Sequence, residues 1–276
     1  MLRVAALQYC ASDDVAKTLH HIQPLIAEAA SKASLVALPE CANYLAASRE
    51  QLFQKAEWDD ESYSQKWLGN IAREFSIWLL AGSLIMRRRD NNQLANRSLL
   101  FGPDGEMIAY YDKIHMFDAD VGDGKMYQES SSFSAGQSPV IAHIDNVPCG
   151  LTICYDVRFA HLYRQLALDG AKLFLVPAAF TALSGKAHWH VLLRARAIET
   201  GCYVVAPAQS GTHADGRKTY GHSLIINPWG EIIAEAKEGD SIICAALDLS
   251  ATARAQNAIP SLKTNPVIGP TRIIEP

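Results

Sequence analysis

The stretch Gly150-Leu-Thr-Ile-Cys154-Tyr-Asp-Val-Arg158-Phe joins two patterns that together decide the fold class of this chain. The apolar run from Val147 to Ile153 predicts a buried strand, and a helical pattern starts a few residues after Cys154. We therefore expect the Cys154 thiol at the carboxyl end of a strand, just ahead of a helix. Ligands bind at such positions in open α/β proteins, and a helix dipole there favours a thiolate. The alternative role for Cys154 is that of a small buried side chain in the core.

Strand patterns alternate with helical patterns in both halves of the chain, and hairpins interrupt each half. Strands are expected at 3–9, 34–39, 77–85, 96–101, 107–111, 139–144, 147–153, 172–176, 203–208, 223–227, 232–236 and 242–247. Helices are expected at about 13–33, 61–75, 159–168 and 186–200, with a last short helix that Ser250 caps. The strand from Ser34 to Pro39 is wholly apolar, which suits a sheet covered on both faces. These patterns predict an α/β fold with mixed sheets.

The domain organisation follows from where the core pattern stops. A chain of 276 residues can bury a sizeable core, and no linker rich in Pro, Gly or Ser divides it. Residues 112–136 are polar and aperiodic, which is typical of a functional or disordered loop. From Pro260 onward the core pattern ends. We expect a single domain over residues 1–262 and a C-terminal arm over 263–276.

Composition and charge argue against several function classes. The formal net charge of -4 and the short basic run at 87–89 do not favour nucleic acid as a partner. No apolar run is long enough for a membrane span, so no membrane partner is expected. No glycine-rich phosphate-binding motif follows any predicted strand, so no nucleotide cofactor is expected.

The six cysteines are scattered along the chain and predict neither a disulfide framework nor a metal site. Cys149 and Cys154 are expected on one strand, pointing to opposite faces and roughly 16 Å apart. We therefore predict a reducing, cytoplasmic compartment and at least one free thiol.

Three polar residues stand where predicted apolar strands give way to loops: Glu40, Lys113 and Cys154. Taken singly, Glu40 can cap a turn, Lys113 can be a solvated surface charge and Cys154 can be packing. Together they form a chemically complete set. A thiol nucleophile needs a proton acceptor, and a carbonyl under attack needs a positive group beside its oxygen.

A cysteine–histidine pair is the competing arrangement, and His188-Trp-His190 is the most conspicuous histidine motif. Residues two apart on a helix point in different directions, so His188 and His190 would not share a metal ion. No third ligand stands at motif spacing, which favours packing or hydrogen bonding for them. No metal is predicted.

The three polar residues lie in segments that resemble a known family. Leu38-Pro-Glu40, Asp112-Lys113-Ile-His115 and the stretch around Cys154 resemble, in order and spacing, the signatures of the nitrilase or carbon–nitrogen hydrolase superfamily. The resemblance extends to about Leu262. It implies a four-layer αββα sandwich with two mixed sheets. It also implies a homodimer or higher homo-oligomer, in which the stack grows to αββααββα.

The resemblance also implies roles for individual residues. Cys154 would attack the amide carbonyl and form a thioester, and Glu40 would serve as general base and then as acid. Lys113 would stabilise the oxyanion together with the backbone N–H of Tyr155. Glu129 would position Lys113, although a plain loop carboxylate is an equal alternative. The reaction would need no cofactor.

Further segments resemble the branch of the superfamily that holds omega-amidases and deaminated glutathione amidases. In that branch the arginine four residues after the nucleophile binds an α-keto-acid carboxylate, and Arg158 occupies this place. An ion pair with Asp156 or with another carboxylate is the alternative for Arg158. Phe180, in Pro177-Ala-Ala-Phe180, matches an aromatic of the acyl pocket. Segments between 188 and 222 are more similar to the deaminated glutathione amidases, whereas 121–126 is a variant of its own.

The implied reaction is hydrolysis of deaminated glutathione to 2-oxoglutarate and cysteinylglycine, a form of metabolite repair. The substrate is thus expected to be a small-molecule amide that carries a carboxylate. Three alternatives stay open: an omega-amidase acting on 2-oxoglutaramate, a non-catalytic binding subunit on the same scaffold, and a thiol redox protein.

Overall fold

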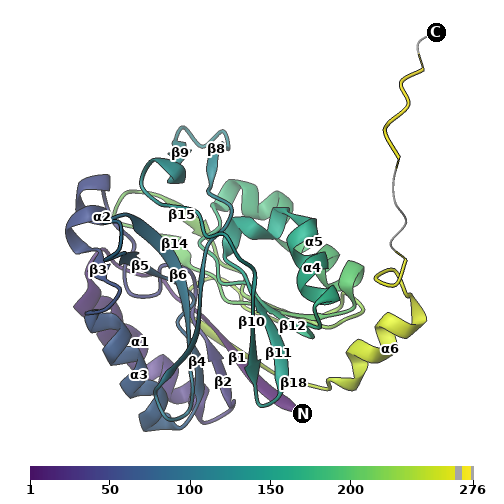
Figure 1. The fold of residues 1–276 in the computed structure, drawn as a ribbon. Coiled ribbons are helices and arrows are strands. Elements are labelled where there is room, and N and C mark those ends of the chain that lie inside the picture. The colour runs from purple at the N-terminus through teal and green to yellow at the C-terminus, as the bar shows by residue number, and fades with distance from the viewer. Residues whose placement is uncertain (265–268, 275–276) are drawn as a thin grey trace.

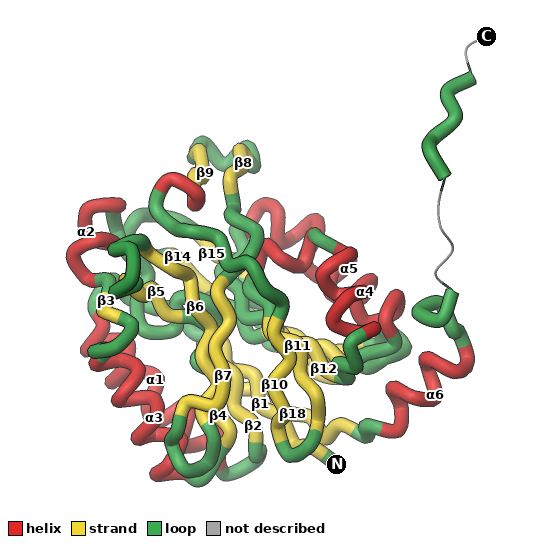
Figure 2. Tube along the Cα trace, viewed as in Figure 1, coloured by secondary structure: helices red, strands yellow, loops and turns green. Residues whose placement is uncertain are grey.

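Two β-sheets lie against each other in the middle of the molecule, and helices cover the outer face of each sheet (Figures 1 and 2). The computed structural model describes residues 1–264 and 269–274. The first sheet has the order β18 (Ser241–Leu247), β1 (Leu2–Gln8), β2 (Leu35–Ala37), β4 (Trp78–Leu80), β6 (Leu94–Phe101), β5 (Leu84–Arg87), β3 (Glu57–Trp58), and β7 (Met107–Asp112) also pairs with β6. The second has the order β10 (Val140–Ile144), β11 (Val147–Leu151), β12 (Leu173–Leu175), β13 (Tyr203–Ala206), β16 (Leu224–Ile226), β17 (Ile232–Glu235).

Both sheets are mixed, as the sequence predicts. Strand β1 pairs parallel to β2 and antiparallel to β18, while β11 pairs parallel to β12 and antiparallel to β10. Helices α1 (Val15–Ala30) and α3 (Tyr63–Phe75) cover the first sheet, and α4 (Ala160–Leu168) and α5 (Ala182–Thr200) cover the second (Figure 1). The four-layer αββα sandwich is thereby confirmed.

The side chains of β1 alternate between two cores, which explains why a central strand has apolar residues on both of its faces. Val4 and Ala6 belong to the core that includes the space between the sheets, together with Leu151 of the second sheet. Leu7, one residue on, packs in a separate core with Ile22 of α1. Because both faces of each sheet are covered, neither face of a central strand needs polar residues.

The strand predicted over 77–85 is wrong as a single element. It is divided into β4 and β5, and residues 81–83 between them leave the strand geometry. Gly82 lies so close to the segment before Glu40 that an added Cβ would be 1.9 Å from the carbonyl oxygen of Pro39. Only glycine permits this approach, which brings the chain around the backbone that carries Glu40.

The aperiodic segment 112–136 contains a small hairpin. Strands β8 (Asp118–Asp120) and β9 (Met126–Gln128) pair antiparallel, and a single 3₁₀ turn, η1 (Glu129–Ser131), follows. A second hairpin, β14 (Ser210–Thr212) with β15 (Lys218–Tyr220), was not predicted either, nor were β3 and the helix α2 (Arg49–Lys55). Strands of three residues are too short to display a period of two.

Local predictions at three helix starts need correction. Helix α5 begins four residues before the predicted start at Lys186, and α4 begins one residue after Phe159. Ser250 is the first residue of α6 (Ser250–Ala258) and not its cap. The Asp248 carboxylate accepts hydrogen bonds from the Ser250 backbone N–H at 3.1 Å and from its hydroxyl at 2.6 Å.

Cys154 does not share a strand with Cys149. Strand β11 ends at Leu151, and Cys154 opens a five-residue 3₁₀ helix, η2 (Cys154–Arg158). All six cysteines carry free thiols.

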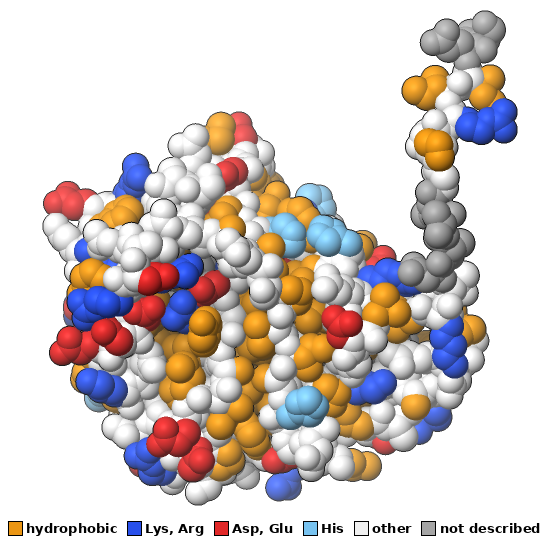
Figure 3. Space-filling model, viewed as in Figure 1, with side chains coloured by type: hydrophobic (Ala, Val, Ile, Leu, Met, Phe, Trp, Pro, Cys, Tyr) orange, Lys and Arg blue, Asp and Glu red, His pale blue; other side chains and the backbone are white. Residues whose placement is uncertain are grey.

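Exposed hydrophobic side chains occur on one face of the molecule, and the described residues nearest the C-terminus are exposed. Hydrophobic side chains gather over β7 and β10 on the face seen in Figure 3, where Met107, Ile108 and Tyr110 of β7 are exposed. Among the described residues, no helix is both long and apolar enough to span a bilayer. The predicted arm at 263–276 falls partly outside the described residues, and residues 269–274 within it are exposed.

Candidate active site

The sandwich brings Glu40, Lys113 and Cys154 to one cavity at the junction of the two sheets. Glu40 follows β2 and Lys113 follows β7, both strands of the first sheet, whereas Cys154 follows β11 of the second. Glu129 comes from η1, at the end of the small hairpin. All four line a cavity of about 470 Å³.

Lys113 is the centre of the charged cluster. Its ammonium nitrogen lies 3.0 Å from Oε1 of Glu40, and 2.9 and 2.8 Å from the two carboxylate oxygens of Glu129. Only 2% of the Lys113 side chain is exposed. A buried ammonium needs such compensation, because an unpaired charge away from water is very costly.

Two further groups hold Glu40, and sequence reasoning missed both. The Asn96 side-chain amide donates to Oε1 of Glu40 at 2.8 Å and to Oε1 of Glu129 at 3.2 Å. The backbone N–H of Ala179, which follows β12 in the second sheet, donates to Oε2 of Glu40 at 2.8 Å. A signal for Asn96 existed, because Asn96-Arg97-Ser98 places polar residues inside β6, every residue of which is buried.

The cluster keeps Glu40 ionised. Burial alone would raise the pKa of Glu40, but the positive charge of Lys113 and hydrogen bonds from Cys154, Lys113 and Asn96 leave it below its usual value. Burial opposes the charge on Lys113 too, yet Glu129 and Glu40 hold the pKa of Lys113 well above its usual value. The resting site therefore contains a carboxylate base and an ammonium cation.

The Cys154 thiol is protonated at rest, which corrects the expectation that a helix dipole favours its thiolate. Burial, and then the negative charge of Glu40, raise the pKa of Cys154 well above its usual value, although Lys113 acts in the opposite direction. The helix that Cys154 opens is one short 3₁₀ segment, and Cys154 itself has a φ of +46°. A protonated thiol hydrogen-bonded to a carboxylate is a nucleophile whose general base is already in place.

Asp156 supports the segment after Cys154. Arg158 forms no ion pair with Asp156 or with any other carboxylate of the described residues, so that alternative is wrong. The buried Asp156 carboxylate accepts hydrogen bonds from the Tyr111 hydroxyl at 2.8 Å and from the Ile153 backbone N–H at 2.8 Å. It also accepts from the backbone N–H of His115 at 3.1 Å and lies 2.7 Å from the Nδ1 of that ring.

The three predicted substrate-binding residues lie around the cavity in different ways. Tyr155 and Phe180 line it. Arg158 is outside its lining, with its guanidinium carbon 5.1 Å from the centre of the Phe180 ring and 5.8 Å from that of Tyr155. Its Nη1 lies 3.3 Å from Nδ1 of His188. Arg158 thus lies next to both aromatic rings that line the cavity.

A second group of charges, also missed from the sequence, lines the same cavity: Arg49, Lys125, Asp215 and Arg217. Asp215 accepts from Arg217 Nη2 at 3.0 Å, and the backbone carbonyl of Asp215 accepts from Lys125 Nζ at 2.8 Å. Arg49 donates to the carbonyl of Ser131 at 2.6 Å. Because these charges come from α2, the β8–β9 hairpin and the β14–β15 turn, no local motif joins them.

Comparison with known proteins places the chain among relatives. The family model described as carbon-nitrogen hydrolase matches residues 3–257. The chain belongs to this family. It is therefore a hydrolase that acts on amides, as the motifs around Glu40, Lys113 and Cys154 predicted, and the resemblance to the superfamily is confirmed.

Individual relatives cover nearly the whole carbon–nitrogen hydrolase chain. A deaminated glutathione amidase of Synechocystis sp. is 41% identical over 263 residues, which are 94% of this chain and 96% of the relative. The omega-amidase NIT2 of Xenopus tropicalis is 35% identical over 259 residues, which cover 94% and 92%. The crystal structure of Saccharomyces cerevisiae Nit3, a member of branch 10 of the nitrilase superfamily, superposes with a TM-score of 0.85. It is 31% identical, and the match covers 94% of each chain.

Proposed function

We propose that this carbon–nitrogen hydrolase cleaves the amide of deaminated glutathione, giving 2-oxoglutarate and cysteinylglycine through a thioester on Cys154. The observation that carries the proposal is the buried contact network of Glu40, Lys113 and Glu129 beside a protonated Cys154 thiol. The name of the Synechocystis relative supports the choice of substrate.

In the first half of the proposed reaction, Cys154 Sγ attacks the amide carbonyl carbon while Glu40 takes the thiol proton. The carbonyl π-electrons move to oxygen, and Lys113 and the backbone N–H of Tyr155 stabilise the resulting oxyanion. When the C–N bond breaks, Glu40 returns the proton to the leaving amine and the thioester remains.

In the second half, a water molecule attacks the thioester carbonyl while Glu40 again accepts a proton. Collapse of the second tetrahedral intermediate breaks the C–S bond, and the thiolate regains the proton from Glu40. Lys113 keeps its charge in both halves, and Glu129 holds it in place through two oxygen contacts. No cofactor takes part in this scheme.

Substrate charge matches the cations around the cavity. Deaminated glutathione carries a keto-acid carboxylate at one end and a glycine carboxylate at the other. Arg158, with Phe180 and Tyr155 as the aromatic wall, is proposed to bind the keto-acid end. Lys125 and Arg217 also line the cavity and are proposed to bind the glycine end. The smaller 2-oxoglutaramate has one carboxylate and would leave this second group unused.

The alternative enzyme is an omega-amidase, which the identity to the Xenopus protein favours. A side-by-side assay decides between the two activities. Both keto-amides are supplied to the wild type and to Cys154→Ala, and 2-oxoglutarate, ammonia and cysteinylglycine are quantified. We expect preferred turnover of the peptide amide and none by the variant. Appreciable turnover of 2-oxoglutaramate with little of the peptide amide would overturn the choice of substrate.

A non-catalytic binding subunit and a thiol redox protein are tested by intact-mass measurement. The proposed enzyme gives a transient mass increase equal to the 2-oxoglutaryl acyl group, located at Cys154 and absent from Cys154→Ala. A binding subunit would show no adduct with either protein. Full hydrolytic activity in Cys154→Ser would contradict the thioester mechanism.

We further propose a homodimer or larger homo-oligomer in the reducing cytoplasm. The oligomer rests on the resemblance to the superfamily, and the compartment rests on the free thiol that the mechanism needs.

A further inference from the structure

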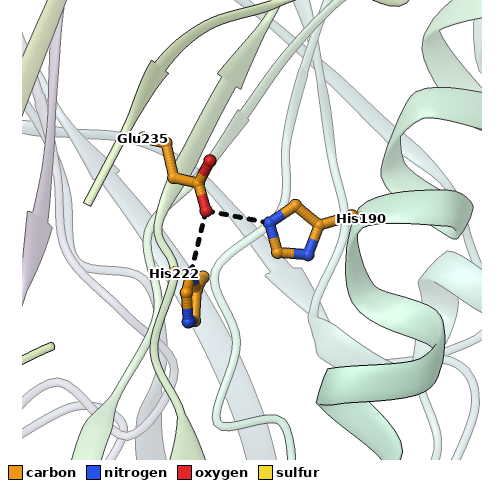
Figure 4. A group of neighbouring side chains, drawn as sticks. All are labelled: His190, His222 and Glu235. Carbon is orange, nitrogen blue, oxygen red and sulfur yellow. Dashed lines mark hydrogen bonds and ion pairs between the residues drawn. The ribbon is translucent and has the colours of Figure 1, made fainter. Parts of the chain in front are cut away.

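A second cluster of chemically active side chains lies outside the catalytic cavity. His190 comes from α5, His222 from the segment before β16 and Glu235 from the end of β17 (Figure 4). Nε2 of His190 is 3.0 Å and Nδ1 of His222 is 2.8 Å from the same carboxylate oxygen of Glu235. One nitrogen of each ring and one carboxylate oxygen lie within 4.8 Å of one another. None of the three residues lines the cavity of Cys154.

Neighbouring groups hold this cluster in place. The indole N–H of Trp189 donates to the backbone carbonyl of His222 at 2.7 Å, which ties the His222 segment to α5. The Tyr220 ring stacks on the His222 ring with centroids 4.4 Å apart. His222 has a φ of +52°, a conformation that costs free energy for a residue other than glycine. The two rings and the carboxylate are therefore preorganised by three separate elements.

We propose that His190, His222 and Glu235 bind one divalent transition-metal ion, with zinc as the best match. Two imidazole nitrogens and one carboxylate oxygen are a common zinc ligand set, and a water molecule can take the fourth position. The ring and carboxylate side chains are 28%, 28% and 37% exposed, so water and metal can reach them.

The spacing fits after a small adjustment. Tetrahedral zinc with bonds of about 2.0–2.1 Å separates its ligand atoms by about 3.4 Å. Opening the present 2.8 and 3.0 Å contacts by about half an ångström would admit the ion.

The ion would join α5 to the second sheet close to the substrate wall. Trp189, next to His190, is fully buried and its ring packs 5.1 Å from that of Phe180. Metal binding to the folded chain would therefore raise its thermal stability, and the stabilisation would grow with the free-metal concentration. The proposal does not depend on the identity of the amide substrate.

The test uses the full chain after treatment with a chelator, titrated with Co²⁺ and with Zn²⁺. We expect one equivalent to bind, with a Co²⁺ spectrum typical of nitrogen and oxygen ligands, and zinc to raise the melting temperature. His190→Gln, His222→Asn and Glu235→Gln should each weaken binding at least tenfold. Asparagine is chosen at His222 because it tolerates a positive φ. His143→Gln, an exposed histidine on β10, is the matched control and should bind as the wild type does.

Several results would overturn the proposal. They are the absence of stoichiometric binding, undiminished binding in His190→Gln and Glu235→Gln, or an intense thiolate-to-cobalt absorption that assigns the ion to a cysteine. Because His190 and Glu235 belong to different elements, misfolding of one variant leaves the other as a valid test. Melting curves without metal identify any misfolded variant.

Discussion

At the scale of single residues, Glu40 is the proposed acceptor of the thiol proton, and its charge also sets the resting state of Cys154. Its negative charge is the main electrostatic cause that raises the pKa of the thiol, while Lys113 acts in the opposite sense. In the proposed mechanism, the same carboxylate suppresses a free thiolate at rest and provides the base that forms one during attack.

Glu40→Gln should consequently separate hydrolysis from simple thiol reactivity. Without the carboxylate, amide turnover is lost, but Lys113 remains and lowers the pKa of Cys154 relative to the wild type. Alkylation of Cys154 by iodoacetamide at pH 7 should then be faster, by about tenfold for each unit of pKa change. Peptide mass spectrometry reads the modification at Cys154.

The matched control for this experiment is Glu50→Gln, which removes the same charge at an exposed position on α2. It should leave both alkylation and turnover unchanged. Slower alkylation of Glu40→Gln would show that Glu40 also acts as base toward the alkylating agent.

Asn96 is a positioning residue whose loss should alter the pH profile. Its amide stabilises the ionised form of Glu40, so Asn96→Ala should raise the pKa of Glu40 and move the acidic limb of the rate profile to higher pH. A hydrogen bond to a charged group contributes about 1.5–3 kcal/mol, which corresponds to a loss in kcat of about ten- to a hundredfold.

Ser98→Ala is the control for Asn96, since Ser98 is buried on the same strand and its hydroxyl has no partner among the described residues. Its kcat and pH profile should match the wild type. A lower kcat in Asn96→Ala without any movement of the acidic limb would assign Asn96 a packing role instead.

The residues that could be predicted from the sequence are those whose chemistry shows in a local segment. Glu40, Lys113 and Cys154 could be predicted because each stands at a strand end inside a recognisable segment. The polar run that contains Asn96 was visible in the sequence, but its contacts were not, because they exist only after β6 has been placed beside Glu40 and Glu129. The protonation of Cys154 was mispredicted for a similar reason, since burial and a remote carboxylate outweigh a local helix.

At the scale of elements, the β8–β9 hairpin connects the parts of the cavity that are proposed to serve catalysis and substrate binding. Its last residue precedes Glu129, and its turn carries Lys125. The Phe117 ring, just before the hairpin, packs 5.0 Å from both Tyr127 and Tyr155. The hairpin is thereby fixed to the wall beside the nucleophile.

Lys125→Ala tests whether this hairpin selects the longer substrate. We expect KM for deaminated glutathione to rise about five- to tenfold, since a partly exposed ion contact contributes about 1 kcal/mol. KM for 2-oxoglutaramate and kcat for both substrates should change little. Steady-state kinetics on the two amides, with the exposed Lys66→Ala of α3 as control, measures this difference. An equal rise for both amides would exclude a role in selection.

Element boundaries were predictable where an apolar period was long, as in β1, β6, α1 and α3. They were missed where a contact between distant segments decides the backbone. Gly82 ends β4 because it approaches Pro39, a contact about forty residues apart that no local pattern contains. The short hairpins were not predicted because their strands are too short to show an alternating pattern.

At the scale of the whole molecule, the αββα stack leaves an apolar stripe on its outer helical layer. Val191 and Ile198 on the outer side of α5 are 66% and 51% exposed, and Trp229 beside them is 56% exposed. Such a stripe on a surface helix is typical of an interface. In the proposed oligomer, this stripe would face the second αββα unit.

Val191→Glu should therefore convert a dimer into a monomer, because the interface would have to bury an unpaired charge. Sedimentation velocity at several protein concentrations measures the change. Tyr110→Glu, an exposed residue of β7 on another face, is the control and should remain dimeric. A wild-type chain that sediments as a monomer would contradict the proposed oligomer.

The contact between Glu40 and the Ala179 backbone spans the two sheets, with one partner from each. The separation of the sheets is thus a dimension of the catalytic geometry itself, and small loosening of the sandwich alters the rate before any strand melts. Mild heat or dilute urea should inactivate the enzyme while its circular dichroism stays native. Turnover would then report how closely the two sheets pack against each other.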